Sequence, residues 1–61
     1  MVMLFVTVRF YGRNKGTVEM NHEITDQWFM ADNYTREELH KEMLERYAYV
    51  WDIKVIRTEE I

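Results

Sequence analysis

Few side chains in this sequence of 61 residues have both the type and the spacing that catalysis or metal binding requires. It contains no Ser and no Cys, which excludes serine and cysteine nucleophiles as well as disulfides and Cys-based zinc sites. Its two glycines cannot form a phosphate-binding loop. The only imidazoles, His22 and His40, are expected to point into the layer between sheet and helix, where a His pair with a nearby carboxylate is one interpretation. Because they lack the spacing of metal ligands, we interpret them instead as boundary histidines bonded to backbone groups. We therefore expect no enzymatic activity, no metal and no cofactor.

Charge and hydropathy limit the range of functions further. Eight basic residues against eleven acidic residues give a formal net charge of −3. This balance argues against broad, phosphate-driven DNA binding, and it is too mild for an acidic mimic of nucleic acid. No apolar run approaches the roughly 18 residues of a membrane span, and the N-terminal residues lack a secretory signal. Together with the absence of Cys, these features predict a cytoplasmic protein without a membrane contact.

The element that must position any functional side chain is a helix predicted over residues 35–48. Thr35 and Glu38 form a capping box, in which the hydroxyl accepts the N–H of Glu38 and the carboxylate reaches back to the N–H of Thr35. The acidic pair Glu37 and Glu38 also suits the positive end of the helix dipole, so it requires no catalytic role. Apolar side chains gather on one side of this helix: Leu39, Met43, Leu44 and Tyr47.

Before the helix, an alternation of period two predicts a strand over Val2–Tyr11. The following segment, Gly12–Gly16, holds both glycines and an Asn, residues that tolerate positive φ, so we expect a hairpin loop there. A symmetric hairpin places Val18 opposite Phe10 and extends the second strand to Ile24. Apolar side chains then meet on one face of the hairpin.

The rest of the chain completes the sheet. Residues 25–26 are predicted to form a second turn, followed by a short third strand over Gln27–Ala31, and the alternative is an irregular loop across residues 25–34. After the helix, Val50–Thr58 alternates again and predicts a last strand, whose neighbour the sequence leaves open. We therefore predict a single α+β domain over residues 1–61. It is a small two-layer fold, a mostly antiparallel β-sheet in the order β-β-(β)-α-β with one helix packed on one face.

One helix can cover only one face of such a sheet, so the other face is the candidate functional surface. Strand alternation puts Met3, Phe5 and Tyr11 on the uncovered side, and a turn at residues 25–26 adds two more apolar residues. Exposed aromatic, Met and Arg side chains are typical of protein interfaces. The predicted partner-binding residues are Met3, Phe5, Arg9, Tyr11, Trp28 and Met30.

The function that we predict from this surface is that of a small non-catalytic regulator or inhibitor that occupies a surface of a partner protein. It is similar in kind to the small regulators and inhibitors that bacteriophages and mobile elements encode. A chain of this size buries little surface, so its nine aromatic residues and five Met also favour a homodimer. A structural subunit of a larger assembly would carry the same features.

A second interpretation of the same face is a module that binds single-stranded nucleic acid. Phe5 and Tyr11 interleave with the basic residues Arg9, Arg13 and Lys15 along the first strand and its loop, as in stacking platforms for single strands. Acidic residues on the neighbouring strand weaken this positive field. Nucleic-acid binding therefore ranks second among the functions expected from the sequence.

Overall fold

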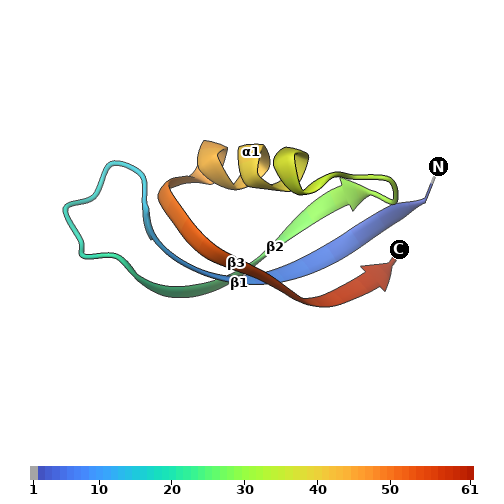
Figure 1. Ribbon diagram of the computed structural model, residues 1–61, viewed down its shortest axis with the longest axis horizontal. Helices are drawn as coiled ribbons and strands as arrows, with labels where there is room; N and C mark the ends of the chain where they lie inside the picture. Colours follow the sequence, from blue (N-terminus) through green and yellow to red (C-terminus); the bar gives the residue numbers. More distant parts are fainter. Residues whose placement is uncertain (1) are drawn as a thin grey trace.

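The computed structural model describes residues 2–61 and contains three strands and one helix (Figure 1). In chain order these are β1 (Met3–Asn14), β2 (His22–Ala31), α1 (Arg36–Arg46) and β3 (Tyr47–Glu60). β1 is the central strand and is antiparallel to both neighbours, in the sheet order β2-β1-β3. The helix lies across one face of the sheet and leaves the other face uncovered, so the predicted two-layer α+β fold is confirmed.

The pairing of β1 with β2 is unbroken over ten residue pairs. Val6 lies opposite Trp28 and Phe10 lies opposite Ile24, so the predicted register was wrong by six residues. Residues 25–26 continue β2 instead of turning, and neither the separate third strand nor the irregular loop is present. The longer ladder brings Trp28 and Met30 into the core under the helix, where burial of their apolar surface stabilises the fold.

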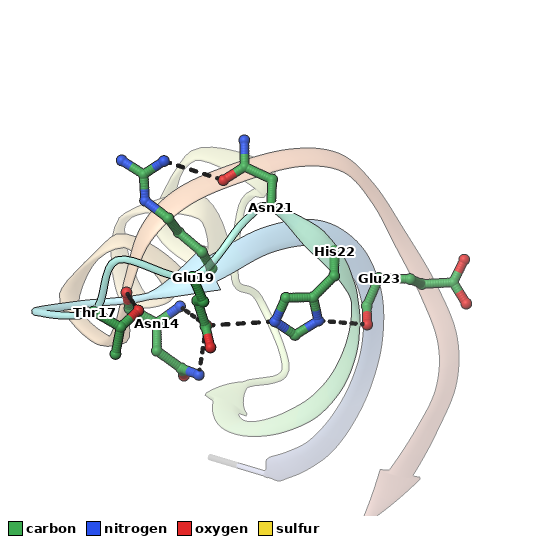
Figure 2. Close-up of polar contacts among 7 residues, drawn as sticks. Asn14, Thr17, Glu19, Asn21, His22 and Glu23 are labelled. Carbon is green, nitrogen blue, oxygen red and sulfur yellow. Dashed lines mark hydrogen bonds and ion pairs between the residues drawn. The ribbon is translucent and has the colours of Figure 1, made fainter.

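The hairpin loop after β1 spans residues 15–21 and is longer than predicted (Figure 2). The carboxylate of Glu19 is the centre of the hydrogen bonds in this loop. One carboxylate oxygen, Oε1, accepts hydrogen bonds from the backbone N–H and the side-chain amide of Asn14, both at 2.9 Å, and lies 3.4 Å from Nε2 of His22. The Thr17 hydroxyl donates to the carbonyl of Asn14 at 3.1 Å. The bond from the Asn14 N–H is the main reason that the pKa of Glu19 lies below its ordinary value.

The two glycines of the predicted loop have different roles. Gly16 adopts a positive φ of 72° within the loop, as expected. Gly12 lies instead inside β1, where a Cβ would stand 2.1 Å from the backbone oxygen of Tyr49 on β3. Gly12 therefore permits a close approach of the two strands, and a larger residue would force their pairing to shift.

β3 is longer than the segment of β1 that it pairs with. Its fourteen residues lie opposite residues 4–14 of β1, and three register shifts take up the difference. At the middle shift Asp52 has a φ of 55°, a left-handed conformation that Asp tolerates better than most residues. Such bulges increase the local twist, so β3 curls along its edge of the sheet and offers little regular backbone for another strand to pair with.

The core lies between α1 and the covered face of the sheet. Val6, Val8 and Phe10 of β1 form its centre, and Leu39 and Met43 of α1 pack onto them. These five side chains are at most 1% exposed. The remaining core residues come from β2 and β3: Trp28, Met30, Tyr47 and Val50.

The helix begins as predicted and ends slightly earlier. The Thr35 hydroxyl accepts the N–H of Glu38 at 3.2 Å, and it is this hydroxyl, rather than the N–H of Thr35, that donates to the Glu38 carboxylate, also at 3.2 Å. The helix stops at Arg46 because Tyr47 is extended and starts β3. Leu44, predicted on the apolar side, is exposed. No helix in the described part of the chain is long and apolar enough to cross a membrane.

A cluster of polar side chains connects the end of α1 to β2. Asp26 Oδ2 accepts hydrogen bonds from the Tyr47 hydroxyl at 2.5 Å and from Arg46 Nη1 at 2.9 Å. Arg46 Nη1 also donates to the carbonyl of Gln27 at 3.1 Å, and the guanidinium lies 4.7 Å from the centre of the Trp28 ring. The Gln27 N–H donates to Asp26 Oδ1. The N–H and the carbonyl of Gln27 are therefore both hydrogen-bonded to side chains, so the middle of the β2 edge is not free to pair with another strand.

The same cluster shifts two pKa values in opposite directions. Burial acts to raise the pKa of Asp26, but the hydrogen bonds from Tyr47, Arg46 and the Gln27 N–H together hold it below its ordinary value. The contribution of this carboxylate to stability is therefore present at neutral pH and is lost on acidification. Burial is the main reason that the pKa of Tyr47 is raised from 10.0 to about 12, and the hydrogen bond to Asp26 is the second.

We expect the stability of the fold to fall at high pH because of Tyr47. A pKa that is raised in the folded state contributes stability that is complete below the ordinary pKa of 10.0 and is lost as the pH rises toward 12. Thermal unfolding followed by circular dichroism across this range should show the loss. The Tyr47→Phe variant lacks the titrating hydroxyl and should lose less stability over the same range. An equal pH dependence of the two proteins would contradict this prediction.

Candidate functional site

The candidate functional site is the face of the sheet that α1 leaves uncovered, which we call the open face. Cross-strand partners share a face, so the odd-numbered residues of β1 and their partners define it. Its members on β1 are Met3, Phe5, Thr7, Arg9, Tyr11 and Arg13. Those on β2 are Glu23, Thr25, Gln27, Phe29 and Ala31, and those on β3 are Tyr49, Trp51, Lys54, Arg57 and Glu59.

Aromatic side chains form two groups on the open face. Phe5 and Phe29 pack together with ring centroids 5.1 Å apart, in the half of the face near the chain termini. Tyr11 and Trp51 are cross-strand partners in the half near the hairpin loop, and Tyr49 lies beside them. Phe29 and Trp51 are each 64% exposed. Rings with this exposure are available for stacking against a ligand.

The open face has a different charge balance from the rest of the chain. The open face carries four basic residues, Arg9, Arg13, Lys54 and Arg57, and three acidic ones, Glu23, Glu59 and Asp52, the last of which pairs with Lys54. The other four basic and eight acidic residues of the sequence lie outside this set. The chain is therefore acidic as a whole, while basic residues outnumber acidic residues on the open face.

Ion pairs join some of these groups to one another. They are Arg9–Glu23, Lys54–Asp52 and Arg57–Glu59, and in the first two the nitrogen and oxygen atoms are 3.8 Å apart. These side chains are between 46% and 71% exposed to solvent. Exposed ion pairs contribute at most about 1 kcal/mol. The basic groups can therefore exchange these carboxylates for the anionic groups of a ligand at little cost.

A hollow of about 170 Å³ opens in the half of the open face near the hairpin loop. All three strands contribute to its lining. Its residues are aromatic (Phe10, Tyr11 and Trp51), cationic (Arg9 and Lys54) and acidic (Glu23 and Asp52). A nucleotide can bind through both kinds of group, because its base stacks on exposed aromatic rings and its phosphate pairs with the cationic groups beside them.

Four of the six predicted partner-binding residues lie on the open face, and two do not. The prediction was wrong for Trp28 and Met30, which are 4% and 6% exposed in the core. Because β2 runs through residues 25–26 without a turn, every later side chain of the strand lies on the face opposite to the predicted one. Of the predicted nucleic-acid contacts, Arg9 and Arg13 lie on the open face, whereas Lys15 lies in the hairpin loop.

Sequence reasoning missed five functional candidates on the open face: Phe29, Tyr49, Trp51, Lys54 and Arg57. The false turn placed Phe29 on the covered face. The β3 residues could not be placed, because the neighbour of the last strand was unknown and three register shifts interrupt its alternation. The sequence did contain one signal for β2. Ile24, Trp28 and Met30 are all even-numbered, so a single uninterrupted strand places their side chains on the same face, toward the core.

The two histidines lie apart from the core, and the prediction that they face the layer between sheet and helix was wrong. Both are exposed. His22 Nδ1 lies 3.3 Å from the carbonyl of Glu23, so one histidine does bond a backbone group. His40 lines a cleft of about 510 Å³ between α1 and β3, which shares Trp51 and Asp52 with the hollow. Within residues 2–61 no group of three or more His, Asp or Glu side chains could hold a metal ion.

Comparison with known family models, with curated proteins and with solved structures gives no match. The function is therefore inferred from the geometry and charge of the open face.

Proposed function

We propose that this protein binds single-stranded nucleic acid on the open face of its sheet and catalyses no reaction. One observation carries the proposal, the presence of exposed aromatic rings and an excess of basic residues on a single face. The exposed rings are those of Tyr11, Phe29, Tyr49 and Trp51, and the partly buried ring of Phe5 packs against Phe29. Unpaired bases stack on such rings, and basic side chains beside them pair with the phosphates.

The positions of the side chains favour nucleic acid over a protein partner, in the reverse of the order expected from the sequence. Trp28 and Met30, which supported a protein interface, belong to the core. β3 instead adds Trp51, Lys54 and Arg57 to the open face, an aromatic ring and two cations. The negative charge of the chain lies mainly outside this face, so it opposes a bound strand less than the net charge implies.

Fluorescence anisotropy of a labelled single-stranded oligonucleotide of mixed sequence tests the proposed function. If Arg9, Lys54 and Arg57 each contact one phosphate, the logarithm of the affinity should fall with the logarithm of the salt concentration with a slope of about −2. This corresponds to roughly a 20-fold loss between about 50 and 200 mM salt. A duplex of the same sequence should bind more weakly, because its bases are not free to stack on the rings. Failure to bind the single strand at the lowest salt would contradict the proposal.

A protein partner is the second candidate, and one specific observation favours it. Met3, Phe5 and Phe29 form an apolar group in the half of the open face away from the hollow. Such a group suits an apolar pocket on another protein, including a second copy of this chain. Self-association in sedimentation experiments that disappears in Phe29→Ser, with oligonucleotide affinity unchanged, would assign this group to a protein contact. For both functions we propose a cytoplasmic location, since the chain has no Cys.

A further inference from the structure

The hollow near the hairpin loop contains two carboxylates that a phosphate-binding surface does not need. Glu23 and Asp52 line it together with Tyr11 and Trp51. Each carboxylate lies 3.8 Å from one basic group of the same lining, which is beyond hydrogen-bond distance. Asp52 joins the lining because it lies in the bulge of β3, where its φ is 55°.

An ionised carboxylate only accepts hydrogen bonds, which limits what it can bind in such a position. Cytosine presents an exocyclic amino group that donates to Asp and Glu, whereas thymine has a carbonyl oxygen at the same place on the ring. A carboxylate facing that oxygen leaves two acceptors against each other. The two pyrimidines are otherwise similar in shape, so the carboxylates can discriminate between them where stacking cannot.

We propose that this hollow is a subsite for one nucleobase with an exocyclic amino group, with cytosine preferred over thymine. The inference rests on the proposed function. The base lies against Trp51 and Tyr11 and donates its amino protons to Glu23 or Asp52. Arg9 and Lys54 exchange these carboxylates for the phosphates on either side of the base. This preference applies only to the base in the hollow, and the other bases of the strand stack on the open face without a preference for their identity.

The test compares oligo(dC) with oligo(dT) of the same length by fluorescence anisotropy at low salt. The unmodified protein should bind oligo(dC) roughly five- to tenfold more tightly, at the low end of the discrimination that a base contact gives because the hollow is open to solvent. In the double variant Glu23→Gln with Asp52→Asn, the ratio of the affinity for oligo(dC) to that for oligo(dT) should fall close to one. The amides keep the size of the carboxylates but both donate and accept, so they can bond either base.

The outcomes separate this inference from the proposed function. Equal affinity of the unmodified protein for both oligonucleotides, or tighter binding of oligo(dT), overturns the subsite and leaves single-strand binding in place. A preference for oligo(dC) that survives in the double variant also overturns it, because the carboxylates are then not its cause. Absence of binding to either oligonucleotide overturns the proposed function itself. Both side chains are mostly exposed, and a circular dichroism spectrum confirms that the double variant folds.

Discussion

Val6→Glu is expected to unfold this protein, whereas Phe5→Glu, one position away, is expected to leave it folded. Val6 has no solvent exposure and lies at the centre of the core, opposite Trp28. An isolated carboxylate there loses its hydration without gaining a partner, which costs several kcal/mol or forces the group to protonate. At 0.05–0.15 kcal/mol per residue, a chain of this length has roughly 3–9 kcal/mol of stability to lose. Circular dichroism of the Val6→Glu variant should therefore show an unfolded chain.

Phe5→Glu tests the other face with the same change of charge. Phe5 is only partly buried, and on the open face its ring packs against Phe29. Loss of an aromatic pair costs about 0.5–1.5 kcal/mol beyond the buried area, which the fold should survive. Urea denaturation should give a lower midpoint with a transition that remains cooperative. If Phe5→Glu unfolds the protein as completely as Val6→Glu does, the open face is part of the core and no ligand can bind there.

The largest expected effect on binding comes from Trp51→Ala combined with Lys54→Glu. Trp51 is one of the two most exposed aromatic rings on the open face, and stacking of a base on such a ring is worth about 1–3 kcal/mol, or roughly 5- to 150-fold in affinity. Lys54→Glu removes one cation, which should reduce the salt slope by about 0.7. Anisotropy titrations of the two single variants and the double variant should show loss of affinity in each and the largest loss in the double variant.

Lys41→Glu is the matched control for the change of charge. Lys41 is exposed on α1, in the layer opposite the open face, and the substitution changes the net charge by the same amount as Lys54→Glu. If the nucleic acid binds the open face, Lys41→Glu should retain nearly the full affinity and the full salt slope. Equal losses in the two variants would mean that only the net charge of the chain matters, and that the open face is not the binding site.

Elements with local causes could be predicted from the sequence. The cap of α1 depends on Thr35 and Glu38, which are three residues apart, and it forms where predicted. The alternation of β1 assigns Val6 and Val8 to one face and Phe5 to the other whatever the partner strand is, because side chains of a strand alternate. These local rules were sufficient to predict the layer structure and the contribution of β1 to the open face.

Features that depend on which residues meet across the sheet could not be predicted from local patterns. The register of β2 was wrong by six residues because two alignments of β1 with the following segment both bring apolar side chains together, and only packing under α1 distinguishes them. The same packing keeps residues 25–26 in the strand, which moved Trp28 from the predicted site into the core. The place of Trp51 and Lys54 beside β1 depends on three bulges that no local pattern predicts, since a bulge forms only against a paired strand. The open face could therefore be predicted on its central strand, whereas the residues that complete it come from contacts between distant parts of the chain.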